Sequence, residues 1–322
     1  MPTYGLDELY SLDDAKVDLV FVHGLTGDRR RSWTKNNVFW PKELLPLDLP
    51  LARIITFGYD AAVVDLNNEV SQSTIETHAA DICDRLARLR LGTLAFERPI
   101  IFVAHSLGGL VCAQTIVNGA AGVPTDNAFI IANRTRGIVF LGTPFHGSPT
   151  AKYMEVLRRI IDIFHNTNSR KINDLKERSE KLEILVEAFA RRLRQRLSEG
   201  KELGVFFFSE TLPIHGHVIV PENNAKIIGY GDHASIHANH SEICKFASEH
   251  DEGYKSVLAA IKKLAEKATE IKTKVGAFGG VTVHDINLVH QDSITNIWNN
   301  NDNTKVGQQV GQQNITGGLN FS

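Results

Sequence analysis

The sequence has few cysteines, no long apolar run and no excess of charge of either sign. Its three cysteines, Cys83, Cys112 and Cys244, lie far apart, which matches neither metal-ligand spacing nor a disulfide framework. No apolar run approaches the roughly 18–20 residues that span a bilayer, and the acidic first segment lacks the layout of a secretory signal. Because 35 basic residues oppose 37 acidic ones, we expect no nucleic-acid partner. These absences favour a reduced, cytoplasmic protein without a metal or cofactor.

The apolar residues, 43% of the 322, are grouped in runs that predict buried strands. Runs rich in β-branched residues and poor in charge are typical of strands covered on both faces in a parallel sheet. They occupy residues 17–24, 52–59, 99–105, 136–144, 204–210 and 225–230. Helical periodicity is found in residues 74–91, 107–120 and 252–272. This alternation predicts an α/β fold class with a mostly parallel central sheet flanked by helices.

Two segments depart from this alternation. Residues 150–203 are charged and helical in pattern, and we interpret them as a helical cap inserted over one edge of the sheet. Residues 299–322 are dominated by Asn, Gln and Gly, and this composition buries too little apolar surface to fold alone. We therefore predict one folded domain at 1–275 and a low-complexity tail at 276–322.

The motif A-x-S-x-G occupies residues 104–108, where a predicted strand turns into a predicted helix. A serine on such a turn is pushed above the sheet, and small residues two before and two after it let the backbones approach. Ala104 and Gly108 meet that need. We predict that Ser106 is the nucleophile of an α/β-hydrolase fold rather than a helix-capping serine.

The loop after the first predicted strand, residues 23–27, lies where this fold supplies the second backbone donor of an oxyanion hole. We predict that the amides of Leu25 and Leu107 hold the tetrahedral oxygen. His23 is expected to shape this loop through hydrogen bonds and not to act as a base.

The order Ser, then Asp or Glu, then His is typical of this fold, and it limits the search for the acid and the base. Glu210 ends the predicted strand 204–210 and is the preferred acid, with Glu222 and Asp232 as alternatives. For the base, spacing alone does not choose between His233, His237 and His240.

The motifs HGLTGDRRRSWT, FWPKELLP, FVAHSLGGLVCAQ, GIVFLGTPFHGS and ANHSEICKF together resemble one family. It comprises the lipase-like α/β-hydrolases related to the serine-active-site-containing protein and to fungal SesB. The resemblance covers about residues 17–262. It implies that His240, in an N-H pair before an apolar-Cys-Lys segment, is the base, and it supports Glu210 through the stretch 208–211. The sequence departs from the family by having Asn239 where an acidic residue usually precedes the histidine.

The resemblance also implies a biological setting. SesB-like proteins of fungi often end in a short prion-like motif that an activated NLR-type receptor templates, and residues 299–322 are similar in composition and position. The partners expected from it are an ester or lipid substrate, an NLR-type receptor or a further copy of the chain bound through 299–322, and peripheral contact with a membrane.

These observations support two hypotheses of different kinds. The first is a serine hydrolase of carboxylic esters, lipase-like or esterase-like, that acts through Ser106, His240 and Glu210 in a cell-death or defence pathway. The second is a signalling effector whose hydrolase fold serves recognition or membrane association. Thioester or peptide-bond hydrolysis is a weaker alternative, because a triad does not separate acyl leaving groups. The arginines at 29–31 and 191–196 are interpreted as solvated faces.

Overall fold

The structure, a computed structural model, describes residues 4–25, 27–59, 72–91, 95–145, 156, 159–160 and 172–278. The chain divides into two units, Met1–Lys274 and Val275–Ser322. The predicted tail beyond Phe278 and most of residues 150–171 of the predicted cap lie outside the described residues. No helix of the described residues is long and apolar enough to cross a membrane.

A seven-stranded sheet runs through the first unit in the order β1-β5-β2-β6-β7-β8-β9. β1 pairs antiparallel with β5, and every other pair is parallel. The strands are β1 (Gly5–Tyr10), β2 (Val17–Val22), β5 (Ala52–Gly58), β6 (Ile100–His105), β7 (Thr135–Leu141), β8 (Gly204–Glu210) and β9 (Asp232–Ile236). Because β2 and β5 to β9 are parallel, their carboxyl ends meet at one edge of the sheet, where ligands bind in open α/β sheets. The predicted fold class and five of the six predicted strands are confirmed.

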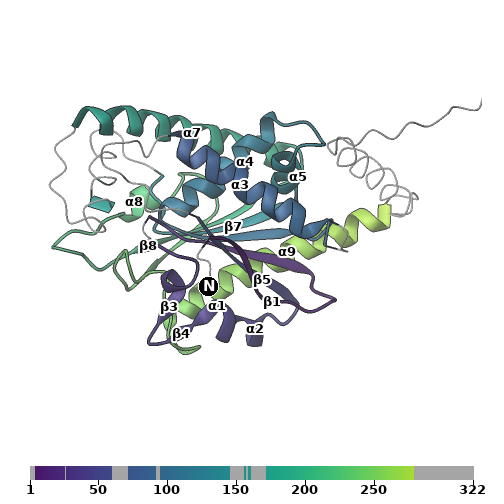
Figure 1. Cartoon of the computed structure of the whole chain (residues 1–322), viewed down its shortest axis with the longest axis horizontal. Coiled ribbons are helices and arrows are strands. Elements are labelled where there is room, and N and C mark those ends of the chain that lie inside the picture. Colours follow the sequence, from purple (N-terminus) through teal and green to yellow (C-terminus); the bar gives the residue numbers. More distant parts are fainter. Residues whose placement is uncertain are drawn as a thin grey trace, which may run out of the picture. The chain divides into compact units, whose positions relative to one another are not determined.

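Helices cover both faces of the sheet, as Figure 1 shows. On one face lie α3 (Gln72–Arg90), α4 (Leu107–Ala121), α5 (Asn127–Arg134) and α7 (Ile172–Ser198). On the other lie α1 (Trp40–Glu43), α2 (Leu45–Asp48) and α9 (Glu252–Phe278). Alternate residues of each strand point to the two faces: Val20, Val22 and Phe102 belong to the first core cluster, and Leu19 and Phe21 belong to the second.

The short elements complete the described chain. The connection from β2 to α1 contains η1 (Arg31–Trp33) and the two-stranded sheet of β3 (Thr34–Lys35) and β4 (Val38–Phe39). Its Trp33 and the first residue of α1, Trp40, are fully buried against Phe21. This excursion is therefore fixed to the sheet by aromatic packing, worth about 0.5–1.5 kcal/mol per ring pair beyond buried area.

The prediction of a strand at 225–230 is wrong. Ala225 ends α8 (Glu222–Ala225), residues 226–230 form a turn, and the last strand of the sheet is β9. Gly229 and Gly231 have φ of +84° and +64°, which interrupt an extended backbone, and Ile228 is 77% exposed. β9 is too polar to be recognised from periodicity, because only Ile236 of its five residues is buried.

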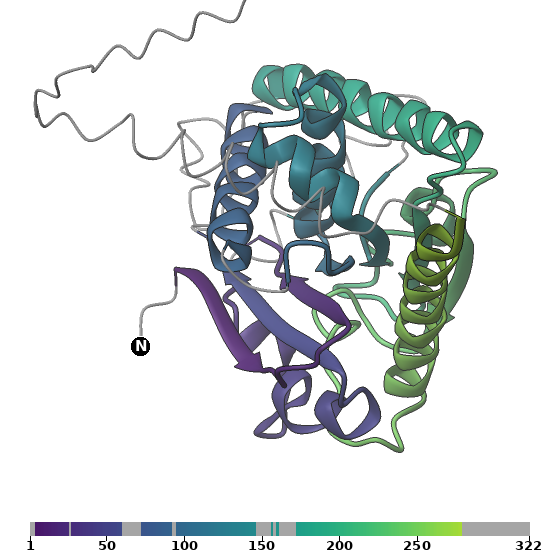
Figure 2. The same cartoon turned by 90° about the vertical axis from the view of Figure 1, so that its right-hand side faces the viewer.

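Helix α7 is the described part of the predicted cap segment, residues 150–203. One side of it contributes Leu185, Phe189 and Leu193 to the core cluster on the α4 side, and Figure 2 shows α7 lying across the helices of that face. Near its end Arg196 donates to the backbone oxygens of Ala132 and Thr135, 3.0 and 2.8 Å away. α7 is thus fixed to the domain at its carboxyl end.

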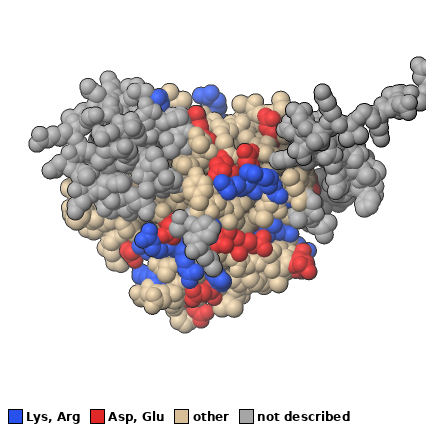
Figure 3. Space-filling view, viewed as in Figure 1, with Lys and Arg blue, Asp and Glu red and all other residues tan. Residues whose placement is uncertain are grey.

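Two of the arginines expected on solvated faces are buried. Arg196 is 2% exposed, and its buried guanidinium donates to the backbone oxygens described above. Arg29 is 9% exposed and lies 3.4 Å from the Asp7 carboxylate. On the face drawn in Figure 3, basic and acidic side chains are interspersed. These two arginines are therefore occupied within the chain and contribute nothing to a basic surface for nucleic acid.

The second residue of β2, Asp18, is an aspartate buried among three arginines. Asp18 is fully buried and accepts from Arg53 Nε and Nη2 at 2.9 and 2.7 Å, from Arg98 Nη1 at 3.0 Å and from Arg90 Nη1. Arg90 also donates to the backbone oxygens of Phe96 and Arg98. Burial lowers the pKa of Arg90 to about 10, and the Asp18 charge opposes that change. The cluster ties the amino end of β2 to β5, α3 and the segment before β6.

Candidate active site

Ser106 stands on a sharp turn between β6 and α4. It has φ 52° and ψ −126°, outside the regions that a non-glycine residue ordinarily adopts. The neighbouring backbones come very close: a Cβ built on Gly24 would lie 2.8 Å from Ser106 Cβ, and one built on Gly108 would collide with the backbone oxygens of Val22 and His23. This crowding is the physical reason for the small residue at 108.

His240 lies in the loop after β9 and reaches Ser106. Its Nε2 is 2.9 Å from Ser106 Oγ, and both side chains are fully buried. In the tautomer that carries its proton on Nδ1, Nε2 is free to accept from the serine hydroxyl. Asn239 Oδ1 accepts from the amides of Ser241 and Glu242, both at 3.1 Å. Asn239 therefore forms the turn that carries His240, a task that needs a side-chain oxygen but no charge.

Glu210 is the last residue of β8 and faces His240. Its Oε1 lies 3.3 Å from His240 Nδ1 and accepts from the Val220 amide at 2.5 Å. Within the described residues, His240 Nδ1 and Glu210 Oε2 have no partner that satisfies hydrogen-bond geometry. Catalytic hydrogen bonds are often loose without substrate and tighten when it binds. A carboxylate this close still favours the Nδ1–H form of the ring.

Gly142 makes room for this pair. It follows β7 with φ +60°, and a Cβ built on it would lie 3.1 Å from Glu210 Oε2 and 3.2 Å from His240 Nδ1. Contacts this short force a neighbour to move, and the backbone conformation itself disfavours a side chain. Gly142 is a site residue that sequence reasoning missed, because it falls within the predicted strand 136–144, although the strand β7 ends at Leu141.

The other candidates lie elsewhere. Glu222 is half exposed, bonded to Lys226 Nζ at 2.6 Å and 3.4 Å from His233 Nε2. Asp232, also half exposed, pairs with Lys263 at 2.6 Å. The exposed His237 lies 3.2 Å from Thr211 Oγ1. Of the predicted acids and bases, the structure brings Glu210 and His240 together at Ser106 and leaves the remainder in other contacts.

Leu25 and Leu107 border the serine. Leu107 is the first residue of α4, directly after Ser106, and Leu25 follows Gly24 in the loop after β2. In the described part of the chain, neither amide makes a turn, loop or cap hydrogen bond to another backbone group. The first amides of a helix have no intrahelical partner, so the Leu107 N–H is available to a ligand.

Two buried histidines flank this site and stay neutral. His23 Nδ1 donates to the Gly24 oxygen at 2.9 Å, and its Nε2 accepts from the Tyr59 amide at 3.3 Å. Burial lowers the pKa of His23 to about 4. Burial also lowers the pKa of His105 to about 3, with a smaller contribution from the nearby His240. His23 thus holds the loop before Leu25, as expected for a residue that shapes this loop.

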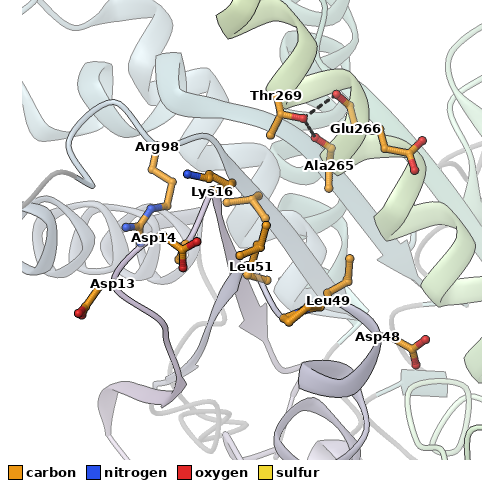
Figure 4. A pocket seen from close by; sticks show the side chains of 14 residues that line it. Asp13, Asp14, Lys16, Asp48, Leu49, Leu51, Arg98, Ala265, Glu266 and Thr269 are labelled. Carbon is orange, nitrogen blue, oxygen red and sulfur yellow. Dashed lines mark hydrogen bonds between the residues drawn. The ribbon is translucent and has the colours of Figure 1, made fainter.

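A groove lies at the opposite end of the sheet (Figure 4). It has a volume of about 820 Å³, and its lining includes Leu49, Leu51, Arg98 and the residues Val17 and Ala52 that begin β2 and β5. Ser106 follows the last residue of the parallel strand β6, so this groove does not hold a substrate for Ser106. Among the described side chains, no group of three or more His, Cys, Asp or Glu is placed to bind a metal ion.

The chain is similar to known proteins in sequence and fold. The profile of the Alpha/beta hydrolase family matches residues 19–220. Protein SERAC1 of Bos taurus is 30% identical over 254 residues, covering 71% of this chain and 36% of the relative. Protein SERAC1 of Homo sapiens is 27% identical over 279 residues, with 79% and 40% covered. The chain thus spans less than half the length of these curated relatives.

Solved structures with a similar fold have low sequence identity. One is the putative non-heme bromoperoxidase BpoC of Mycobacterium tuberculosis H37Rv, with a TM-score of 0.43, 14% identity and coverage of 82% of this chain and 96% of that one. Another is the monoacylglycerol lipase of Paleococcus ferrophilus, with a TM-score of 0.41, 14% identity and coverage of 83% and 99%.

Proposed function

Because the chain belongs to the Alpha/beta hydrolase family, we propose that it is a serine hydrolase of carboxylic esters with Ser106 as its nucleophile. The observation that carries this proposal is the 2.9 Å separation of Ser106 Oγ and His240 Nε2 on a strained strand-to-helix turn. A nucleophile within hydrogen-bond reach of a base, which a third group orients, is the signature of nucleophilic catalysis. Burying three polar side chains costs free energy, so packing alone gives no reason for this arrangement.

In the proposed mechanism Ser106 Oγ attacks the ester carbonyl carbon while its proton passes to His240 Nε2. His240 then gives the proton to the departing alcohol, and the acyl group stays on Ser106 until water, deprotonated by His240, releases it as the acid. Glu210 keeps Nδ1 of the imidazole protonated and stabilises its charged form. The amides of Leu25 and Leu107 donate to the carbonyl oxygen as it gains negative charge.

The surroundings of Ser106 favour an ester with an apolar acyl group. Leu25 and Leu107, which border the serine, are buried in the core cluster that also contains one side of α7. Apolar walls with a few placed polar groups are typical of small-molecule sites. We extend the proposal to lipid esters and assign residues 150–203 the role of covering the acyl pocket. We further propose that the protein is cytoplasmic and contacts a membrane peripherally when it hydrolyses lipids.

A fluorophosphonate probe tests the proposal directly. We expect wild-type protein to be labelled on Ser106, Ser106→Ala to be unlabelled and His240→Ala to react roughly 10³-fold more slowly, since the base activates the serine. Ser209→Ala is the matched control, because Ser209 is also buried but bonds to Ser235 Oγ at 3.0 Å. A folded wild-type protein that stays unlabelled, or labelling that persists in Ser106→Ala, would contradict the proposal.

We propose a second role for the segment that follows α9. Residues 299–322 combine Asn and Gln with Val, Ile, Leu and Phe at intervals and contain only Asp302 and Lys305 as charges. Such segments stack as cross-β assemblies. The resemblance to fungal SesB-type proteins supports recruitment by an NLR-type receptor, or self-assembly, with the hydrolase domain as the effector of a cell-death or defence response.

Removing residues 279–322 separates the two roles. We expect kcat/KM for a short p-nitrophenyl ester to stay within about twofold, because every residue of the proposed site lies within residues 24–240. We expect thioflavin-T-positive fibrils only from the full chain. A large loss of turnover in a truncated protein with unchanged circular dichroism would show that the roles are coupled.

A further inference from the structure

His105 lies between the turn that carries Ser106, the loop that carries His240 and the loop that precedes Leu25. It ends β6, directly before Ser106, and its Nε2 is 2.9 Å from the backbone oxygen of His240. A carbonyl oxygen only accepts, so Nε2 carries the proton and donates. On the other side of the ring, a Cβ built on Gly24 would lie 3.1 Å from His105 Nδ1. One imidazole therefore contacts the base loop and the loop that precedes Leu25.

We propose that His105 is a positioning residue that holds His240 at hydrogen-bond distance from Ser106. The inference deepens the proposed hydrolase function and rests on it. The hydrogen bond fixes the main chain of His240 relative to the residue that precedes the nucleophile. A single backbone junction thus sets the positions of both reacting atoms, and a displacement of about 1 Å between such atoms can cost roughly 10²-fold in rate.

The base loop has other anchors, so its fold does not depend on His105. Trp40 Nε1 donates to the Cys244 oxygen at 2.9 Å, and Cys244 Sγ donates to the Ser32 oxygen at 3.1 Å. The Asn239 turn described above supports the residues next to His240. These contacts act on either side of His240 but not on its carbonyl. Without His105 we expect a folded loop in which His240 shifts.

The charge state of His105 suits this role. The ring centroids of His105 and His240 are 5.2 Å apart. A second cation at that distance would oppose protonation of His240 during the reaction. Burial keeps His105 neutral at working pH, as its lowered pKa indicates. His105 therefore donates a hydrogen bond without adding charge beside the base.

Two substitutions separate the hydrogen bond from the packing. His105→Leu introduces an apolar side chain of similar size and removes the donor, whereas His105→Gln restores an N–H at the position of Nε2. With a short p-nitrophenyl ester we expect His105→Leu to lower kcat about 10- to 100-fold with KM nearly unchanged, and His105→Gln to recover to within about fivefold. Thr135→Val, which removes a buried bond to the Ile131 oxygen at the far end of β7, controls for stability.

A readout that needs no turnover accompanies these rates. In the full chain with ¹⁵N-labelled histidine, we expect the His240 Nδ1–H signal to be sharp in wild type and His105→Gln and broadened in His105→Leu. Equal signals and equal rates in wild type and His105→Leu would overturn the inference, and so would a Thr135→Val variant that loses as much kcat. A wild type with the sharp signal but no probe labelling would refute the proposed function alone.

Discussion

Replacing Glu210 by Gln is expected to lower kcat/KM for ester hydrolysis roughly 10³- to 10⁴-fold while leaving the fold intact. The amide has nearly the same shape as the carboxylate but carries no charge, so it neither stabilises the imidazolium of His240 nor secures the Nδ1–H tautomer. With the wrong tautomer, Nε2 carries a proton and is unable to accept one from Ser106. Steady-state kinetics with a p-nitrophenyl ester and the rate of fluorophosphonate labelling would both measure the loss.

Matched variants at the competing carboxylates make this test specific. Glu222→Gln and Asp232→Asn remove charges that pair with Lys226 and Lys263 on half-exposed surface, where ion pairs contribute at most about 1 kcal/mol. We expect both to retain kcat/KM within about twofold. A loss confined to either of these variants would move the role of the acid away from Glu210 and require a rearranged base loop in the active protein.

The sequence predicts those parts of the molecule whose signals are local. Buried strands such as β2 and β6 are runs of mostly apolar residues, and the A-x-S-x-G motif marks a turn that only small neighbours permit. β9 escaped recognition because it is an edge strand with polar side chains, and the nearby residues 225–230 form the end of α8 and a turn instead. Local composition therefore describes the centre of the sheet better than its edge.

The rest of the site depends on distant contacts. Spacing alone left His233, His237 and His240 equivalent, and the structure separates them because only the loop beyond Asn239 folds back to Ser106. The sequence alone did not indicate His105 or Gly142 as residues of the site. Their importance comes from contacts in the folded chain, where His105 lies against the backbone of His240 and Gly142 lies against Glu210 and His240. Residues that orient a site are visible only once the chain is folded.

Asp18 illustrates the same limit in the core and leads to the largest expected change in stability. A lone aspartate in an apolar run indicates nothing in the sequence, yet it is the anion that Arg53, Arg90 and Arg98 share. Removing one partner of a buried ion pair leaves uncompensated charge and costs about 3–5 kcal/mol. We therefore expect Asp18→Ala to lower the free energy of unfolding by at least that amount in urea titrations followed by circular dichroism.

The size of the effect distinguishes a buried cluster from an ordinary surface pair. Glu202→Gln removes a carboxylate that lies within bonding distance of Lys267, with both side chains about half exposed, and we expect it to change the free energy of unfolding by less than about 1 kcal/mol. Asp18→Asn keeps the volume of the side chain but removes its charge, so we expect its loss in the free energy of unfolding to lie between those of Asp18→Ala and Glu202→Gln. A fall of 1 kcal/mol or less for Asp18→Ala would mean that water reaches the three guanidinium groups and that the amino end of β2 is held by its strand pairing alone.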